Sequence, residues 1–287
     1  MLRSFLAALC IIWFSVACEA RTALSSDLIL YVNGLLGNDA NDCTEEGGAC
    51  ATPQRAVDLA ANAYDLSGYN ITISLAGGQT FFSSSGPVIA FKGGVGYGTI
   101  IVDGTAGNPA TINDTAPLYD AIDTFAGSNG PIYLIQNLNI RASGGGGGGC
   151  GVLIDNPGVL RVGNGVNFQQ FATAAICAAD PGAIVQPYGS FMISGSGKCA
   201  FNISAGAGWI FSNEGSTITF AGDPVFSNAV MCVTAAVAQS LKTVFYGSPI
   251  GARYDVALNG ALMTFGGGPN YFPGSSPGIV GTGGQYE

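Results

Sequence analysis

Residues 152–187, VLIDNPGVLRVGNGVNFQQFATAAICAADPGAIVQP, decide the fold. Within them Asn156-Pro157-Gly158 precedes the apolar run VLRV, and the same pattern returns when Asp180-Pro181-Gly182 precedes AIVQ. Pro and Gly at matching offsets mark turns, and the apolar runs between them are too short for helices. A repeat of about 20 to 25 residues holding several short strands is typical of a β-solenoid, whose coils bury their apolar faces only by stacking.

The same spacing predicts a register for the neighbouring coils. It places Leu153 on Cys177, and a slightly shorter step leads from Cys177 to Cys199. The step from Cys199 to Cys232 is clearly longer, which predicts an insertion near residues 222–228. A sandwich or barrel of irregular strands stays open as the alternative.

The composition supports a turn-rich β protein. Among 287 residues, 45 are Gly, 9% are charged, 48% are hydrophobic and none is His. Gly destabilises helices and surface helices need charged residues, so a helical protein is excluded; disordered chains are poor in apolar residues, so disorder is excluded too. The net charge of −9 and the scattered basic residues exclude nucleic-acid partners.

The N-terminal segment predicts export. Residues 1–20, MLRSFLAALCIIWFSVACEA, combine Arg3 with an apolar run and a small-residue end, as signal peptides do. The run is shorter than the roughly 20 residues of a transmembrane helix. A lipid anchor on Cys18 is the alternative, although the Leu usual three positions earlier is missing. We expect a secreted, periplasmic or cell-surface protein with no membrane contact beyond such an anchor.

Six cysteines remain after this leader, an even number that suggests disulfides in an exported protein. Cys43 and Cys50 bracket a short polar loop and are expected to pair. If the register above holds, stacked strands about 4.8 Å apart bring Cys177 within disulfide reach of Cys199; buried free thiols are an equal alternative. The partners of Cys150 and Cys232 stay open. The spacing and the missing His argue against a zinc site.

One helix is predicted, over residues 52–63. Thr52 can cap it, and Pro53 suits its first turn. Ala56, Leu59, Ala60 and Ala63 share one face, which can cover the open N-terminal end of the solenoid.

Residues 31–60, YVNGLLGNDANDCTEEGGACATPQRAVDLA, resemble the opening of right-handed parallel β-helix proteins of the pectin-lyase-like superfamily. Residues 253–286 are similar to the tails of exported bacterial and prophage β-helix proteins, some associated with phage tail fibres. The resemblance implies an all-β, right-handed parallel β-helix with an N-terminal capping helix. Its expected parts are a signal peptide (1–20), a β-helix domain (21–265, cap 28–64) and a Gly/Pro-rich cap or tail (266–287). Phage-tail relatives are often trimers, so a trimer is one expected state.

Many relatives of this fold cleave polysaccharides. The absence of His and of an Arg-x-Lys motif excludes polygalacturonase-like hydrolysis. A glycoside hydrolase needs two carboxylates, for which Asp120 and Asp123 in LYDAIDTF are candidates. The alternative for this pair is two solvated turn residues.

A lyase would need calcium and a base. Arg161 is the candidate base, on the coil that also carries Asp155, and the alternative is a solvated Arg that keeps its strand soluble. No cofactor is expected unless this lyase alternative holds.

Binding without catalysis needs no specific catalytic groups. Exposed aromatics such as Tyr188 or Trp209 could stack on sugar rings. The sequence therefore favours an adhesive or structural protein that binds a polysaccharide or cell-surface glycan, with a lyase or hydrolase as the alternative. An enzyme would place at least three carboxylates, or a cation beside two, on one face.

Overall fold

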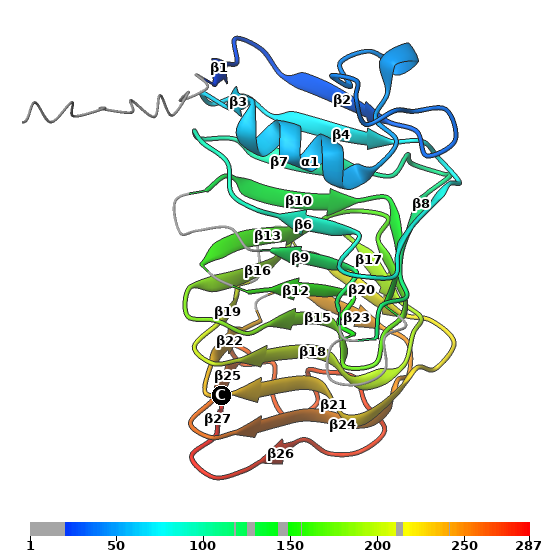
Figure 1. Ribbon diagram of the computed structural model, residues 1–287. Helices are drawn as coiled ribbons and strands as arrows, with labels where there is room; N and C mark the ends of the chain where they lie inside the picture. Colours follow the sequence, from blue (N-terminus) through cyan, green and yellow to red (C-terminus); the bar gives the residue numbers. More distant parts are fainter. Residues whose placement is uncertain are drawn as a thin grey trace, which may run out of the picture.

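The computed structural model describes residues 21–117, 119–124, 130–142, 149–155, 157–210, 215–240 and 242–287. The expected leader, residues 1–20, lies outside the described residues. The chain winds into a parallel β-solenoid whose coils contribute strands to three long sheets (Figure 1). No helix among the described residues is both long and apolar enough to cross a bilayer.

The largest sheet has ten strands, in which successive members come from successive coils. Its strands are β2 (Leu28–Val32), β4 (Ile71–Leu75), β7 (Thr99–Asp103), β10 (Ile132–Gln136), β13 (Gly158–Val162), β16 (Ala183–Pro187), β19 (Gly208–Ile210), β22 (Val237–Gln239), β25 (Ala261–Met263) and β27 (Gln285–Tyr286).

The second sheet has seven strands. They are β5 (Thr80–Ser83), β8 (Ala110–Asp114), β11 (Leu138–Ala142), β14 (Asn167–Gln170), β17 (Phe191–Ile193), β20 (Thr217–Phe220) and β23 (Val244–Tyr246).

The third sheet has eight strands and faces the viewer in Figure 1. They are β6 (Ile89–Phe91), β9 (Ile122–Thr124), β12 (Val152–Ile154), β15 (Ala174–Ala178), β18 (Gly197–Ser204), β21 (Val225–Thr234), β24 (Ile250–Ala257) and β26 (Ile279–Val280). Outside the three sheets lie a two-stranded pair, β1 (Thr22–Ala23) with β3 (Tyr64–Asp65), and a short 3₁₀ helix, η1 (Glu46–Gly48).

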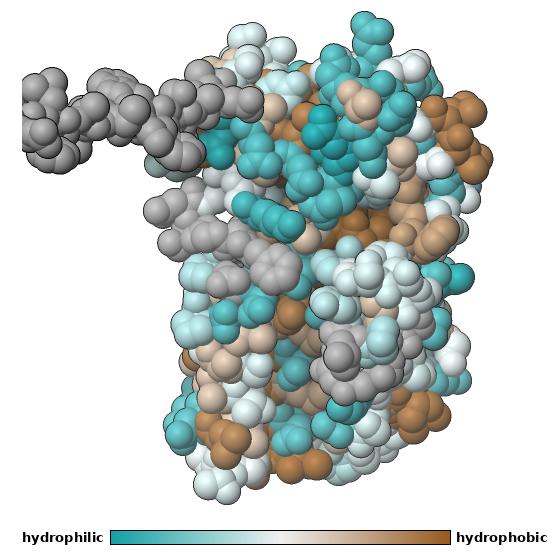
Figure 2. Space-filling model, viewed as in Figure 1, coloured by the Kyte–Doolittle hydropathy of each residue, from teal (hydrophilic) through white to brown (hydrophobic). Residues whose placement is uncertain are grey.

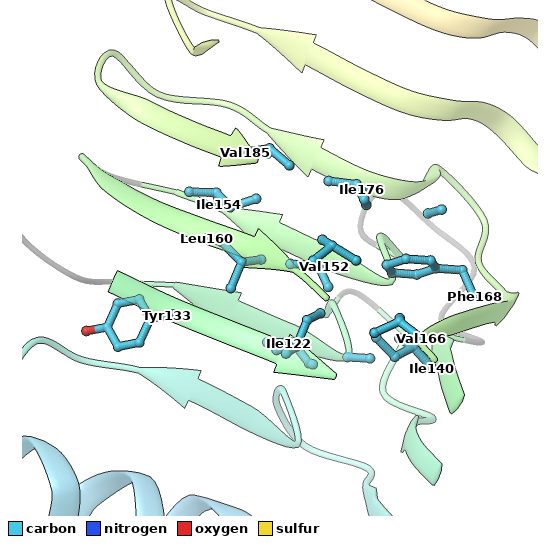
Figure 3. Close-up of a cluster of buried hydrophobic side chains, with 14 of the residues drawn as sticks. Ile122, Tyr133, Ile140, Val152, Ile154, Leu160, Val166, Phe168, Ile176 and Val185 are labelled. Atoms are coloured by element: carbon cyan, nitrogen blue, oxygen red, sulfur yellow. The ribbon is translucent and has the colours of Figure 1, made fainter. Parts of the chain in front are cut away.

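The register predicted from the two Pro-Gly turns is confirmed in the eight-stranded sheet, where Leu153 pairs with Cys177. In the ten-stranded sheet it is wrong by one residue, because Gly158 pairs with Ala183 and not with Gly182. Apolar side chains therefore stack from coil to coil inside the solenoid. Figure 3 shows these stacks for one region: Ile122, Val152 and Ile176 in the eight-stranded sheet, Tyr133, Leu160 and Val185 in the ten-stranded one, and Ile140 and Phe168 in the seven-stranded one.

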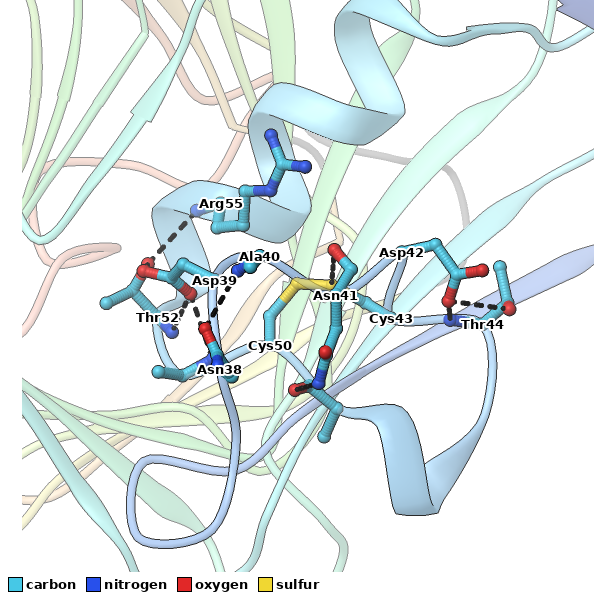
Figure 4. The surroundings of a disulfide bond; sticks show 12 residues. Asn38, Asp39, Ala40, Asn41, Asp42, Cys43, Thr44, Cys50, Thr52 and Arg55 are labelled. Carbon is cyan, nitrogen blue, oxygen red and sulfur yellow. Dashed lines mark hydrogen bonds between the residues drawn. A yellow bond between two sulfur atoms is a disulfide. The ribbon is translucent and has the colours of Figure 1, made fainter.

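The predicted helix is present as α1 (Pro53–Asn62). Thr52 caps it by accepting a hydrogen bond of 3.2 Å from the Arg55 N–H (Figure 4). α1 packs against β6, the first strand of the eight-stranded sheet. There the Gln54 side-chain amide accepts from the Ala90 N–H at 2.6 Å and donates to the Ala90 carbonyl at 3.1 Å. The helix thus satisfies backbone groups that an open sheet edge would expose.

Three disulfides join cysteines of the described residues. Cys43 bonds Cys50, as expected (Figure 4). The proposed bridge between Cys177 and Cys199 is wrong, because Cys177 bonds Cys150 and Cys199 bonds Cys232. These bridges indicate an oxidising, extracellular or periplasmic environment.

The register explains the pairing error. Between β15 and β18, Cys177 pairs with Asn202 rather than with Cys199, and Cys199 itself pairs with Ala174. This coil is therefore longer than the spacing of the two cysteines, which leaves them out of register. The next step is longer still, as predicted, with Cys199 opposite Ala229.

Candidate acidic site

Five carboxyls gather where the seven- and eight-stranded sheets meet and along the outer face of the eight-stranded sheet. We call them the acidic cluster: Asp114, Asp120, Asp123, Asp155 and Asp180. Three of them, Asp120, Asp123 and Asp155, are candidates from the sequence alone. Figure 2, drawn from the side of the eight-stranded sheet, shows polar and apolar side chains mixed along this face.

The solenoid repeat brings these residues together. Asp123 lies in β9, whose neighbour β12 leads directly into Asp155. The strand beyond that, β15, leads within two residues to Asp180. Since neighbouring strands lie about 4.8 Å apart, three successive coils place their carboxyls within a short distance.

Asp123 projects from the outer face because its neighbours on β9 point inward. Ile122 stacks on Val152 in the core, so the alternation of a strand turns Asp123 outward, opposite Leu153. The residue is nevertheless only 6% exposed, and its Oδ1 is buried with no hydrogen-bond partner among the described residues. Burial, reinforced by the negative charges of Asp120 and Asp155, raises the pKa of Asp123 to about 7.

Asp120 has a structural contact. It is 7% exposed, and its Oδ1 accepts a hydrogen bond of 2.6 Å from the Cys150 N–H. Burial raises its pKa although hydrogen bonds from the backbone oppose the shift. The interpretation of Asp120 and Asp123 as solvated turn residues is wrong, because both residues are buried and Asp123 lies within strand β9.

Asp155 and Asp180 are half-buried at the turn that leaves the eight-stranded sheet. Burial raises the pKa of Asp155, and a hydrogen bond to the Asp180 carboxyl together with its charge adds to the rise. Two carboxyls in contact share one proton or bind one donor between them. Asp114, at the end of β8, is fully buried, accepts a hydrogen bond of 2.9 Å from the Ala116 N–H and has a pKa raised by burial.

Arg161 is not part of this cluster. It lies on β13 of the ten-stranded sheet, where its Nε donates to Gln186 at 3.0 Å and its guanidinium lies 4.7 Å from the centre of the Tyr188 ring. Tyr188 is exposed, as expected for a residue that stacks on sugars. However, the Arg161 guanidinium already lies over the face of its ring. The side chain of Trp209 lies outside the described residues.

A single metal ion does not fit the cluster. Among the described residues, no three His, Cys, Asp or Glu side chains converge closely enough to hold one. The carboxyls influence one another electrostatically while each occupies its own position along the face.

Sequence reasoning missed Asp180 and Asp114 as members of the site. Asp180 is visible in the sequence as part of a turn, and the repeat of the Pro-Gly turns is the signal that could have linked it to Asp155.

Comparison of the chain with protein-family models, with curated proteins and with solved structures finds no match.

Proposed function

We propose that the protein is an exported polysaccharide-binding β-solenoid that cleaves glycosidic bonds at the acidic cluster, with Asp123 as the proton donor. A parallel β-solenoid supports a surface-binding or polysaccharide-related role. The observation that carries the catalytic part is the buried Asp123 carboxyl with a pKa of about 7, beside further carboxyls on one face. Carboxyls of the neighbouring segments, Asp120 and Asp155, act on Asp123 electrostatically and support this proposal.

Glycoside hydrolysis needs a carboxylic acid that stays protonated near neutral pH and a second, ionised carboxylate. Asp123 meets the first requirement because burial favours its neutral form. Asp155 and Asp180 are the candidates for the second, because both stay half-buried on the coils that follow Asp123. Asp120 is better suited to holding the site together, because its oxygen is occupied by the Cys150 N–H.

The lyase alternative has less support. Its candidate base, Arg161, contacts Gln186 and Tyr188 on another sheet. The charged neighbours that shift the pKa of Asp120, Asp123 and Asp155 are other aspartates, so the cluster offers a uronate substrate no cation to bind among them.

Incubating the purified protein with a panel of neutral, amino-sugar and uronate polysaccharides tests the proposal. We expect new reducing ends with the wild type and a loss of activity of about a hundredfold or more in Asp123→Asn, the range by which a general acid contributes. Glu46→Gln, an exposed carboxylate on η1, is the matched control and retains activity. An Asp123→Asn variant as active as the wild type would contradict the proposal.

Binding without cleavage is the second candidate, and the Asp120–Cys150 hydrogen bond favours it, because that contact gives a buried carboxyl a purely structural role. Retention of a polysaccharide without new reducing ends would support this adhesive function.

A further inference from the structure

The outer face of the ten-stranded sheet is more apolar than that of a sheet solvated on one side. We propose that this face is the interface of a homodimer, in which two copies of the chain pack face to face. The inference goes beyond the proposed function and does not depend on cleavage at the acidic cluster.

One outward position of the strands carries an aliphatic side chain on coil after coil. Val159 pairs with Ile184 across β13 and β16, and Gly208 continues this register to Val237 on β22. These side chains alternate with inward residues of their strands, and Val237 is 45% exposed. We call the set the aliphatic ladder: Ile132, Val159, Ile184 and Val237.

The next outward position widens this apolar surface. It carries Ile101, which pairs with Leu134 on the following coil, and Met263 near the other end of the sheet. A strand that faces water on one side alternates apolar with polar residues, whereas a strand covered on both faces reads as a continuous apolar run. The run IYLI in β10 has the second pattern. The sheet therefore has the composition of one that is covered on its outer face as well.

The charged groups of this face already have neutral partners in the same chain. Asp103 accepts hydrogen bonds from the side-chain amides of Gln136 at 2.9 Å and Asn137 at 2.8 Å. Arg161 donates to Gln186 at 3.0 Å, and its guanidinium lies over a tyrosine ring. A strongly charged partner would thus find little to pair with here, whereas an aliphatic surface of the same kind is complementary.

The size and symmetry of the face fit a second copy of the chain. With ten strands about 4.8 Å apart and up to five residues per strand, the face measures roughly 48 by 16 Å, or about 800 Å². A stable interface of standard size buries about 800 Å² on each partner. A two-fold axis parallel to the strands would lay the aliphatic ladder of one copy on that of the other. A cyclic trimer would instead need two different patches on each copy.

The outer face of the seven-stranded sheet shows that apolar outward residues are not a general property of this solenoid. At its central outward position, the strands carry polar side chains on most coils. Thr111 pairs with Asn139, Asn139 with Asn167, and Thr219 occupies the same position on β20. This sheet has the composition expected of a solvated face.

Light scattering coupled to gel filtration, at several protein concentrations up to about 100 μM and without polysaccharide, tests the inference. We expect the wild-type protein to have twice the mass of one chain. Val237→Lys and Ile184→Lys should each raise the dissociation constant of the dimer at least about tenfold, because each places a lysine in the interface of both copies. Circular dichroism checks that each variant is folded, and the second variant serves if the first is not.

Val244→Lys is the matched control. Val244 is also 45% exposed, but it lies on β23 of the seven-stranded sheet, so its variant should keep the dimer. A monomer at the highest concentration, a mass of three chains, a dimer that both lysine variants of the aliphatic ladder leave intact, or equal dissociation by Val244→Lys would overturn the inference. Cleavage is measured separately by reducing ends, so an inactive dimer would contradict only the proposed function.

Discussion

Asp120 and Cys150 join the acidic cluster to a disulfide: the Asp120 Oδ1 accepts from the N–H of Cys150 at 2.6 Å, and the Cys150 sulfur is bonded to Cys177 on the next coil. A carboxyl of the candidate site therefore also holds the backbone at the start of the following strand. Asp120 and the Cys150–Cys177 disulfide therefore stabilise the same part of the fold that carries the candidate site.

Replacing Asp120 tests its structural part. Asp120→Ala leaves the buried Cys150 N–H without an acceptor, which costs about 1 to 3 kcal/mol, whereas Asp120→Asn keeps an acceptor oxygen and should cost less. Urea unfolding of the two variants measures the difference. Equal losses would show that the hydrogen bond contributes little.

The pKa of Asp123 predicts a pH dependence of stability. The folded protein keeps a proton on this carboxyl up to about pH 7, whereas the unfolded chain releases it near 3.8, the ordinary value. The native state therefore binds more protons in this window, and its stability falls as the pH rises through it. Between pH 4 and about 8, the free energy of unfolding of the wild type should fall by on the order of a few kcal/mol more than that of Asp123→Asn. Denaturation at each pH measures this difference. Parallel pH curves for both proteins would contradict the raised pKa.

The same carboxyl predicts a pH profile of activity. If Asp123 donates the proton, kcat/KM should fall as the pH rises above about 7, because the acid becomes ionised. Initial rates on the best substrate across the pH range give this profile. A rate that keeps rising above pH 8 would assign the proton transfer to another group.

The disulfides should differ in their contribution to stability. In the chain-entropy description, Cys199–Cys232, with a separation of 33 residues, contributes about 3 to 4 kcal/mol, and Cys43–Cys50, with a separation of seven, about 2 kcal/mol. We expect the double variant Cys199→Ser/Cys232→Ser to unfold at lower urea than Cys43→Ser/Cys50→Ser. The reverse order would indicate that the first loop anchors the solenoid end more strongly than chain entropy alone implies.

The contact of α1 with β6 predicts that the Gln54 side chain stabilises the fold. Gln54→Ala removes the hydrogen-bond partners that Gln54 gives to the Ala90 N–H and carbonyl, and we expect the free energy of unfolding to fall by about 1 to 3 kcal/mol. Gln54→Glu keeps the acceptor and loses the donor, so its loss should be intermediate. Thermal unfolding of the three proteins compares them, and a Gln54→Ala variant as stable as the wild type would show that water replaces the side chain.

The interior stacks predict a contrast between two phenylalanines. Phe168 is fully buried and packs edge-to-face on Phe191 at 6.0 Å between ring centres, whereas Phe82 is 75% exposed. We expect Phe168→Ala to cost about 3 to 5 kcal/mol and Phe82→Ala less than about 0.5 kcal/mol. Urea unfolding of both variants gives the two losses, and comparable values would contradict the assignment of Phe168 to the core.

Much of the fold follows from local chemistry that the sequence displays. Thr52 and Pro53 mark the start of a helix, and the Pro-Gly turns at 157 and 181 give the coil length seen in the eight-stranded sheet, within one residue of that in the ten-stranded sheet. The disulfides could not be predicted in the same way, because coil lengths vary. A slightly longer coil between β15 and β18 moves Cys199 away from Cys177 and opposite Ala174.

The site was only partly predictable for a related reason. Asp120, Asp123 and Asp155 were candidates as residue types, but the burial of Asp123 is a property of the folded solenoid and not of its own segment. Nothing local distinguishes a solvated Asp in LYDAIDTF from a buried one. The raised pKa arises from that tertiary burial, so the chemical character of the cluster appears only when the coils are stacked.

The two inter-coil disulfides have a mechanical consequence. If the ends of the protein were pulled apart, as happens to a surface protein holding a ligand under flow, the coils would unwind but the segments between Cys150 and Cys177 and between Cys199 and Cys232 would stay closed. Those segments span 27 and 33 residues, so roughly 200 Å of extended chain, at about 3.4 Å per residue, could not be drawn out. The two disulfides in the middle of the solenoid would therefore limit how far the pulled protein can extend.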